Sequence, residues 1–316
     1  MNICVLDKSS MGTDTPFDPI YKFGKVDIYE STSPNEAVAR TKNAEIIITN
    51  KVKITDSVIS EATNLKLICV FATGFDNIDL ESARKHGVAV CNVPGYSTDS
   101  VTLITVSTVL ALCSHLIEYN DYVTSRRYSE SGVANRLVPV FHELKGKTWG
   151  IVGFGNIGKA VAKVAEAFGM KILVNKRTPI KDYECVDIET LCKESDIITL
   201  HCPLNDETRN LINEKTLSLM KKSTILVNEA RGAVVDESAV AKAIAKGGIA
   251  GFGCDVYTVE PFPKNHPYNE IMTMPNVILT PHAAWGAYEA RERCVITIAN
   301  NIQSFLDGKT LNRVDI

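Results

Sequence analysis

Short apolar runs alternate with helix-like stretches along this chain, and that alternation constrains its fold more than any other feature. The apolar runs, rich in Val, Ile and Cys, span 3–7, 45–49, 66–71 and 88–92 in one series and 148–155, 171–175, 196–200, 224–228, 251–257 and 276–280 in another. Helical patterns separate them at 34–43, 55–63, 157–168, 188–194, 213–220 and 236–246. This order predicts parallel βαβ units whose sheets are covered on both faces. The expected fold class is therefore α/β, with two doubly wound parallel sheets.

The last helical pattern, at 286–308, follows a second sheet that is already complete. It can return the chain to the first domain, and a long apolar helix at 100–117 can carry the chain out of it. We therefore expect a discontinuous first domain made of 1–98 and 286–316, and a central domain of 99–285. The length of 316 residues agrees with two domains of ordinary size.

Composition argues against several partners and locations. The formal charge is 34 − 37 = −3, which gives no electrostatic reason to expect nucleic acid or an anionic membrane. Nine cysteines without CxxC pairs predict reduced thiols in the cytoplasm, and they lack metal-ligand spacing, so no metal is expected. The N-terminus has the pattern of a strand and not of a signal peptide. Hydroxyl side chains interrupt the uncharged stretch Ser100–Ile117, which we interpret as a buried helix and not as a membrane span.

The segment GFGNIG joins a predicted strand to a predicted helix and has the spacing of a dinucleotide-binding turn. Gly153 permits a tight turn, Gly155 lets the backbone approach a pyrophosphate, and Gly158 lets the helix pack closely on the strand. The helix begins at Asn156 and Ile157, and its free N–H groups attract phosphate. The alternative is an ordinary strand–helix turn without a ligand.

The strand after this turn ends at Asn175, Lys176 and Arg177. A fold that binds NAD usually has Asp or Glu here, which accepts hydrogen bonds from the ribose 2′-hydroxyl. Two cations suit a 2′-phosphate instead. The predicted cofactor is therefore NAD(H) or NADP(H), with NADP(H) favoured. The alternative is a solvated pair of cations, with NAD held by other contacts.

Polar residues follow three predicted strands of the second sheet, at the edge where open α/β sheets bind ligands. Arg231 lies in NEARG, Asp255 and Glu260 lie in DVYTVEP, and His282 lies in TPHAAW. Each residue alone has an ordinary structural interpretation: a surface charge, a turn acid, or a core or capping histidine. Together, beside a dinucleotide turn, they favour a catalytic site.

The chemistry of hydride transfer to a 2-oxo acid gives these residues roles. His282 can donate the proton that the developing alkoxide needs, and Glu260 can orient its imidazole. Arg231 offers a planar fork suited to a carboxylate and a carbonyl oxygen. Asp255 can accept a hydrogen bond from the nicotinamide carboxamide.

These segments resemble the D-isomer-specific 2-hydroxyacid dehydrogenase family, and the resemblance covers most of the chain beyond about residue 45. The matching segments are ATGFDNIDLESARKHGVAVCNVPGYST, ELKGKTWGIVGFGNIGKAVAKVAEAFGMKI, HCPLNDETRNLIN, ILVNEARGAVVDESAV, GCDVYTVEP and ILTPHAAWGAYEAR. The resemblance implies two Rossmann-like domains with a cleft between them, the outer parts of the chain forming the substrate domain. It also implies that Arg231, Glu260 and His282 are the catalytic set.

The resemblance also implies binding residues and an assembly. The substrate residues it indicates are Thr73, Gly74 and Phe75, whose backbone N–H groups would bind the carboxylate, together with Arg231 and His282. Besides those already given, the cofactor residues it indicates are His201, Cys202, Pro203, Thr208 and Ala230. Family members usually form dimers through the nucleotide domain, which here would bury part of the helix at 100–117 and the arm at 120–145.

Within the family, ATGFDNID, NVPGYST and the TPHAAW ending look most like glycerate dehydrogenases, also called hydroxypyruvate reductases. The favoured substrates are hydroxypyruvate or glyoxylate. D-lactate and branched 2-oxo acid reductases share the frame, as do enzymes of formate or phosphite and dinucleotide-sensing corepressors. One departure concerns substrate preference: Thr102, Leu103 and Ile104 stand where the family commonly has Ala, then Gln or Glu, then often His.

Overall fold

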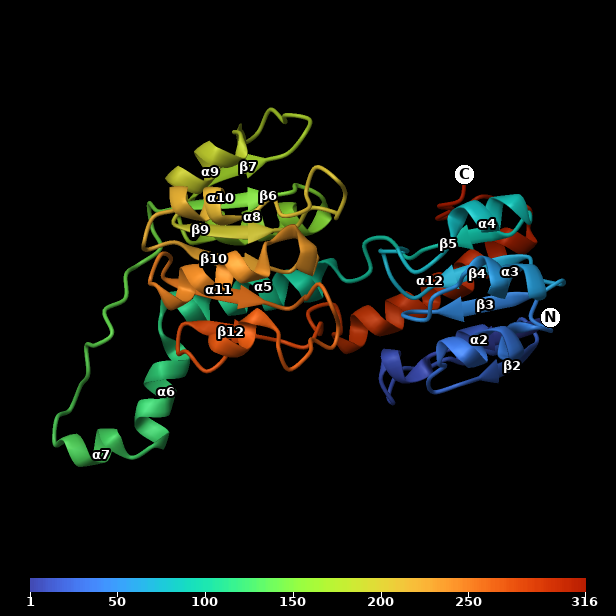
Figure 1. Ribbon diagram of the computed structural model, residues 1–316, viewed down its shortest axis with the longest axis horizontal. Helices are drawn as coiled ribbons and strands as arrows, with labels where there is room; N and C mark the ends of the chain where they lie inside the picture. The colour runs from blue at the N-terminus through green and yellow to red at the C-terminus, as the bar shows by residue number, and fades with distance from the viewer. The chain divides into compact units, whose positions relative to one another are not determined.

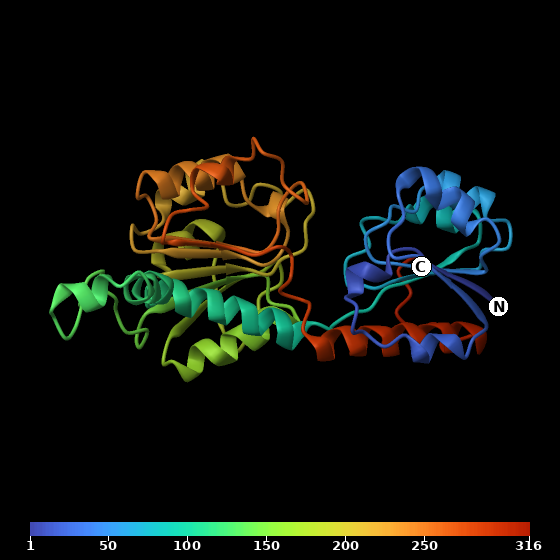
Figure 2. The ribbon, with the colours of Figure 1, turned by 90° about the horizontal axis from the view of Figure 1, so that it is seen from below.

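The computed structural model describes residues 1–316, which form two compact units. The first unit combines Met1–Ser97 with Gly286–Ile316, and the second unit is Thr98–Trp285. Each contains one parallel sheet with helices on both faces (Figures 1 and 2). The predicted fold class, two doubly wound α/β units, is therefore confirmed.

The first unit has a five-stranded parallel sheet of order β2-β1-β3-β4-β5. Its strands are β1 (Asn2–Val5), β2 (Lys25–Ile28), β3 (Ile46–Thr49), β4 (Leu67–Val70) and β5 (Ala89–Cys91). Every residue of β3, β4 and β5 is buried, which explains why these strands are continuously apolar in sequence. The edge strand β2 was not predicted, because it alternates exposed and half-buried residues and carries two charges.

Helices cover both faces of this sheet (Figure 2). On one face lie α2 (Pro34–Thr41), α3 (Asp56–Glu61) and α4 (Leu80–Lys85); on the other lie α1 (Asp18–Tyr21) and α12 (Tyr288–Leu306). A short 3-10 helix, η1 (Lys8–Met11), follows β1. The helix α12 packs against β4 and α1, so the C-terminal segment completes the core of the N-terminal unit.

The second unit has a seven-stranded parallel sheet of order β12-β11-β10-β9-β6-β7-β8. Its strands are β6 (Thr148–Val152), β7 (Lys171–Asn175), β8 (Glu184–Cys185), β9 (Ile197–Leu200), β10 (Ile225–Asn228), β11 (Gly251–Cys254) and β12 (Val277–Leu279). The chain runs outward from β6 through β7 and then returns to β9 on the other side of β6. This reversal is where open sheets of this type bind nucleotides.

Helices also cover both faces of the second sheet (Figure 2). One face carries α5 (Thr98–Cys113) and α8 (Asn156–Ala167), which pack against each other. The other carries α9 (Ile188–Glu194), α10 (Glu214–Leu219) and α11 (Glu237–Ala245), with η2 (Gly232–Val234) and η3 (Pro267–Glu270) in the loops. Trp149, fully buried in β6, donates a hydrogen bond to Thr199 of β9, so the polar atom of its indole is satisfied within the core.

The helix predicted at 100–117 is wrong in its extent. The helix α5 ends at Cys113, and α6 (Leu116–Thr124) starts after a bend of 65°. His115 adopts a left-handed backbone conformation with φ +52°, which breaks the helix. With α7 (Arg127–Ser131), α6 extends away from the sheet of its own unit (Figure 1). No single helix is long and apolar enough to cross a membrane, although α5 and α6 taken together pass that test by length and composition.

Candidate active site

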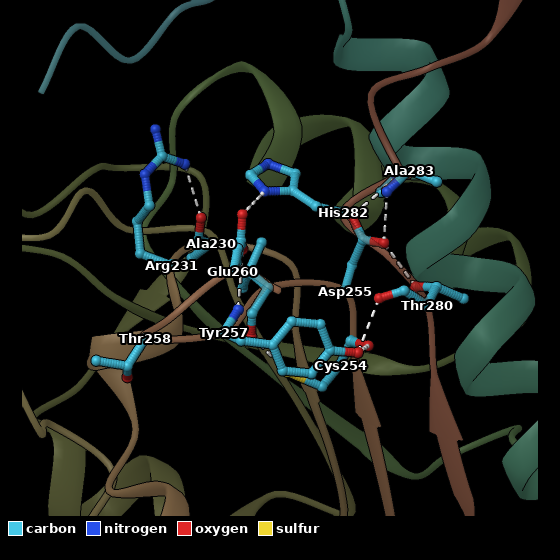
Figure 3. A network of polar contacts seen from close by, with 12 residues as sticks. Ala230, Arg231, Cys254, Asp255, Tyr257, Thr258, Glu260, Thr280, His282 and Ala283 are labelled. Carbon is cyan, nitrogen blue, oxygen red and sulfur yellow. Dashed lines mark hydrogen bonds and ion pairs between the residues drawn. The ribbon is translucent and has the colours of Figure 1, made fainter. Parts of the chain in front are cut away.

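The predicted catalytic residues of the second unit all follow strands that end at one edge of its sheet. Arg231 comes after β10, Glu260 after β11 and His282 after β12, and these three strands are neighbours. Because parallel strands end at the same edge, distant parts of the sequence bring their loops to one place (Figure 3).

His282 and Glu260 form a direct pair. The Nδ1 atom of His282 lies 2.7 Å from Oε2 of Glu260, and the two side chains are 25% and 31% exposed. Figure 3 shows the second ring nitrogen of His282 pointing away from Glu260. A carboxylate on Nδ1 fixes the orientation of the ring, so the geometry leaves Nε2 to face a reacting group.

Backbone contacts hold both partners. Glu260 accepts a hydrogen bond from the backbone N–H of Tyr257 on its other oxygen, at 3.0 Å. His282 has φ +53° and donates its backbone N–H to the carbonyl oxygen of Asp255. The left-handed conformation is uncommon for a residue with a side chain and is often found at functional sites.

Asp255 organises the turn that carries His282. It is 1% exposed, and its carboxylate accepts hydrogen bonds from Thr280 Oγ1 and from the N–H groups of Ala283 and Ala284, at 2.6–2.8 Å. Three strong contacts to the chain itself make Asp255 a structural anchor of this turn. Its predicted contact with a nicotinamide carboxamide stays a prediction.

The Arg231 loop is held by its own backbone. Asn228 bridges the loop, because its side chain donates to the carbonyl oxygen of Arg231 and accepts from the N–H of Ala230. Gly232 must be glycine, since a Cβ there would lie 2.0 Å from the backbone of Tyr257. The guanidinium of Arg231, which is half-buried, donates to the carbonyl oxygen of Ala230.

A second histidine–carboxylate pair supports the Glu260 loop. Glu237 accepts a hydrogen bond from the N–H of Thr258 and contacts Nε2 of His266 at 3.0 Å. Both side chains of this pair are largely buried. Sequence reasoning missed it, because neither residue lies next to a strand end and neither belongs to a quoted catalytic motif.

The glycine turn has the geometry that a dinucleotide requires. Gly153 has φ +87°, and a Cβ there would meet the backbone of Cys202 at 2.5 Å. A Cβ on Gly158 would lie 2.3 Å from the carbonyl oxygen of Gly153, so the helix packs directly on the turn. A Cβ on Gly155 would meet nothing within 4 Å, which leaves open space at the N-terminus of α8 for a phosphate. Asn156 and Ile157 form the first turn of α8.

Lys176 and Arg177 lie directly after β7, one half-buried and the other exposed. The segment after β9 carries the other predicted cofactor residues: His201 and the buried Cys202 stand at the strand end, next to the Gly153 turn. Thr208 donates a hydrogen bond to the carbonyl oxygen of Pro203 and so closes the following loop.

The predicted substrate loop belongs to the first unit. Thr73 donates its hydroxyl to the carbonyl oxygen of Val93 and accepts at its own carbonyl oxygen from Asn92. These contacts fix a loop that leaves Gly74 and Phe75 half-buried at the carboxyl edge of the five-stranded sheet.

The departure from the family pattern on α5 is largely self-contained. Thr102 is buried and donates its hydroxyl to the carbonyl oxygen of Thr98, one turn back in the helix. Leu103 is 62% exposed, and Ile104 is half-buried. The hydroxyl of Thr102 thus needs no partner outside its own helix.

Sequence reasoning also missed Glu229, although the motif NEARG contains it. Glu229 is 8% exposed, and neither of its carboxyl oxygens has a hydrogen-bond partner in the chain. Both ring nitrogens of His201 are also buried without a partner. The sequence signal was an acid directly at a strand end, and its burial could not be read from the sequence.

This fold and site define a nicotinamide-dependent dehydrogenase, and comparison with known proteins gives the family. The model of the D-isomer specific 2-hydroxyacid dehydrogenase NAD binding domain matches residues 106–284, more than half of the chain. A glyoxylate reductase from Thermococcus litoralis is 40% identical over 92% of this chain and 90% of its own length. A glycerate dehydrogenase from Methylorubrum extorquens is 38% identical over 91% of each. The chain belongs to the D-isomer specific 2-hydroxyacid dehydrogenase family and is an NAD(P)-dependent oxidoreductase.

Solved structures agree. An acyclic imino acid reductase in complex with NADPH and D-Arg is 31% identical, with a TM-score of 0.88 over 99% of this chain and 100% of that one. A D-lactate dehydrogenase from Aquifex aeolicus, complexed with NAD and lactic acid, is 31% identical, with a TM-score of 0.83 over 98% of this chain and 96% of that one. One structure holds NADPH and the other NAD, so the choice between the two cofactors does not follow from the fold.

Proposed function

We propose that this protein reduces glyoxylate or hydroxypyruvate to the 2-hydroxy acid. The observation that carries a reductase assignment is the His282–Glu260 pair, held at 2.7 Å on neighbouring loops beside Arg231. The choice of substrate is supported by relatives named glyoxylate reductase, glycerate dehydrogenase and hydroxypyruvate reductase, at 32–40% identity.

His282 is the proton donor in this proposal. Its Nε2–H gives a proton to the carbonyl oxygen of the substrate as that oxygen gains negative charge, and Glu260 stabilises the imidazolium and keeps Nδ1 occupied. When bound, the nicotinamide supplies the hydride. Arg231 pairs with the substrate carboxylate and polarises the carbonyl group. The backbone N–H groups of 73–75 are proposed as further ligands of the carboxylate, because contacts to Val93 and Asn92 hold that loop in place.

The dinucleotide is held by the glycine turn and the N-terminus of α8, with Gly155 leaving the space for its pyrophosphate. We propose that its adenosine end carries a 2′-phosphate bound by Lys176 and Arg177, since no acid occupies the end of β7. The double variant Lys176→Ala/Arg177→Ala should then weaken NADPH binding by about tenfold or more and leave NADH binding nearly unchanged. A wild-type enzyme that prefers NADH would contradict this part of the proposal.

A homodimer is also part of the proposal. The arm that leaves the sheet after α5 exposes apolar side chains on α6 and on the segment before β6, namely Leu116, Ile117, Val123, Leu137, Val138, Val140 and Phe141. An apolar patch of this size favours a protein partner, and most soluble oligomers are symmetric dimers. Light scattering should give a dimer for the wild type and a monomer for Leu137→Asp/Val140→Asp. A monomeric wild type would rule the dimer out.

A reducing compartment, the cytoplasm, is proposed because all nine cysteines are free thiols. Seven of them are buried: Cys4, Cys69, Cys91, Cys192, Cys202, Cys254 and Cys294. Burial keeps such thiols inert, and a reducing environment keeps them unpaired.

A substrate panel tests the proposed activity. Oxidation of NADH and NADPH is followed spectrophotometrically with glyoxylate, hydroxypyruvate, pyruvate and 2-oxoisocaproate. We expect the highest kcat/KM with glyoxylate or hydroxypyruvate. A clear preference for pyruvate or 2-oxoisocaproate would move the enzyme to another substrate class. Cofactor binding without turnover of any 2-oxo acid would favour a dinucleotide-sensing module instead.

A further inference from the structure

Glu229 is a buried carboxyl group that the proposed reaction does not use. It follows β10 directly and is 8% exposed, and both Oε1 and Oε2 lack a hydrogen-bond partner in the chain. Buried polar groups in folded proteins are nearly always hydrogen-bonded or matched by an opposite charge. An unpartnered carboxyl at the ligand edge of a sheet therefore points to a group that the chain does not itself supply.

Strand register places Glu229 between two other titratable residues. The last residues of β9, β10 and β11 pair with one another, so the residues that come next, His201, Glu229 and Asp255, lie side by side. Asp255 is satisfied by three hydrogen bonds from its own turn. His201 and Glu229 are the two members of this row with unsatisfied polar atoms.

The electrostatics of this row keep Glu229 neutral in the free protein. Burial, with the neighbouring charge of Asp255, raises the pKa of Glu229 to about 9. Burial lowers the pKa of His201 to about 3, so no cation faces Glu229 from β9. Burial also raises the pKa of Cys254 and of Tyr257, which keeps both neutral. A carboxylate at this position lacks a compensating positive charge.

The position of the row in the sheet indicates which ligand can supply that charge. The glycine turn and the end of β7 hold the adenosine half of a dinucleotide, on one side of the strand-order reversal. The strands β9, β10 and β11 lie on the other side, which is the half for the nicotinamide. The oxidised nicotinamide ring carries a positive charge, and the reduced ring is neutral.

We propose that Glu229 couples the redox state of the bound cofactor to a proton: its carboxyl group is protonated with the reduced cofactor and loses that proton to solvent when the oxidised cofactor binds. The inference rests on the proposed function, because it needs a nicotinamide cofactor in this site. Glu229 would thereby set the relative affinity for the two cofactor forms, without touching the substrate.

The sign of the effect follows from linkage. An ionised Glu229 attracts the oxidised ring, so binding of the oxidised form lowers the pKa of this carboxyl and releases a proton. The oxidised form should therefore bind more tightly as pH rises from about 6 to about 9. The reduced form has no net ring charge, so its affinity should change much less through Glu229.

The experiment measures dissociation constants of the oxidised and reduced forms, NAD⁺ with NADH and NADP⁺ with NADPH, over this pH range. In the wild type we expect the ratio of Kd(oxidised) to Kd(reduced) to fall about tenfold or more, because each tenfold fall in the pH-dependent Kd requires the bound cofactor to lower the pKa of the carboxyl by about one. In Glu229→Gln, which keeps the shape and cannot ionise, the ratio should change less than about threefold. Equal slopes in the two proteins would overturn the inference.

Two controls separate Glu229 from other groups. Glu194→Gln removes an exposed carboxylate of α9 in the same unit and should keep the wild-type slope. His282 and Glu260 remain in every variant, so their titration contributes equally to all slopes.

Calorimetry of the wild type gives a second test that needs no variant. Titrations in two buffers of different ionisation enthalpy count the protons released on binding. At about pH 8 the oxidised form should release a larger fraction of one proton than the reduced form. Equal proton counts would contradict the inference even if Glu229→Gln failed to fold. Failure of both cofactor forms to bind would overturn the proposed function as well, which distinguishes the two failures.

Discussion

At the scale of single residues, function depends on charges that the backbone holds in place. Glu260 is fixed by the N–H of Tyr257, and His282 is fixed by the carbonyl oxygen of Asp255. The left-handed conformation of His282 shows that the turn is shaped around this residue, because such backbone geometry costs free energy unless the surroundings impose it.

Arg231 gives the first residue-scale prediction. Arg231→Ala should raise KM for the 2-oxo acid and lower kcat, because the substrate carboxylate and the carbonyl oxygen both lose a charged donor. A loss of about 10- to 100-fold in kcat/KM is expected from hydrogen bonds to charged groups. Steady-state kinetics on the best substrate measure it. Arg231→Lys keeps the charge without the fork and should recover only part of the loss; full recovery would contradict a bidentate role.

At the scale of elements, the strands could be predicted far better than their breaks. The runs at 45–49, 66–71 and 224–228 are continuously apolar because both sheet faces are covered. The bend at His115 could not be predicted, because no Gly or Pro marks it and the apolar pattern continues into α6. The burial of Glu229 was equally invisible, since it depends on how neighbouring strand ends pack.

The glycine turn gives a paired prediction at this scale. Gly158→Ala places a Cβ 2.3 Å from the carbonyl oxygen of Gly153, so it should destabilise the second unit by about 2 kcal/mol through overpacking. Gly155→Ala meets no atom within 4 Å and has an ordinary φ of −81°. It should leave the thermal unfolding temperature unchanged and weaken dinucleotide binding about tenfold or more, because its methyl group takes the space of the pyrophosphate. Tight binding by a folded Gly155→Ala would contradict the assigned phosphate site.

At the scale of the whole molecule, the candidate site was more predictable than its energetics. Arg231, Glu260 and His282 were found because each follows a strand end of one parallel sheet, and the structure places their loops together. The roles of these residues stay proposals. The supporting contacts of Glu237, His266 and Glu229 could not be found, because they depend on long-range packing that leaves no local pattern.

Glu229 also predicts how stability varies with pH in the free protein. Its pKa is about 9 in the folded chain against an ordinary value of 4.5. Its contribution is therefore fully present below about pH 4.5 and is lost as pH rises toward 9. At pH 7 the cost of keeping it protonated is about 3 kcal/mol, so Glu229→Gln should raise the unfolding temperature of the second unit at neutral pH. Calorimetric melting from about pH 5 to about pH 9 checks this, and a variant that melts below the wild type throughout would contradict it.

The proton-donor role of His282 is the central claim, and the turnover of His282→Ala tests it most directly. Under saturating cofactor and the best 2-oxo acid, kcat should fall by about 10²- to 10⁴-fold, because general acid catalysis is lost. The cofactor Kd, measured on the same protein, should stay within about twofold of the wild type. His142→Ala, at an exposed histidine of the same unit, should keep wild-type turnover. A His282→Ala enzyme that retains nearly full kcat would contradict the assignment.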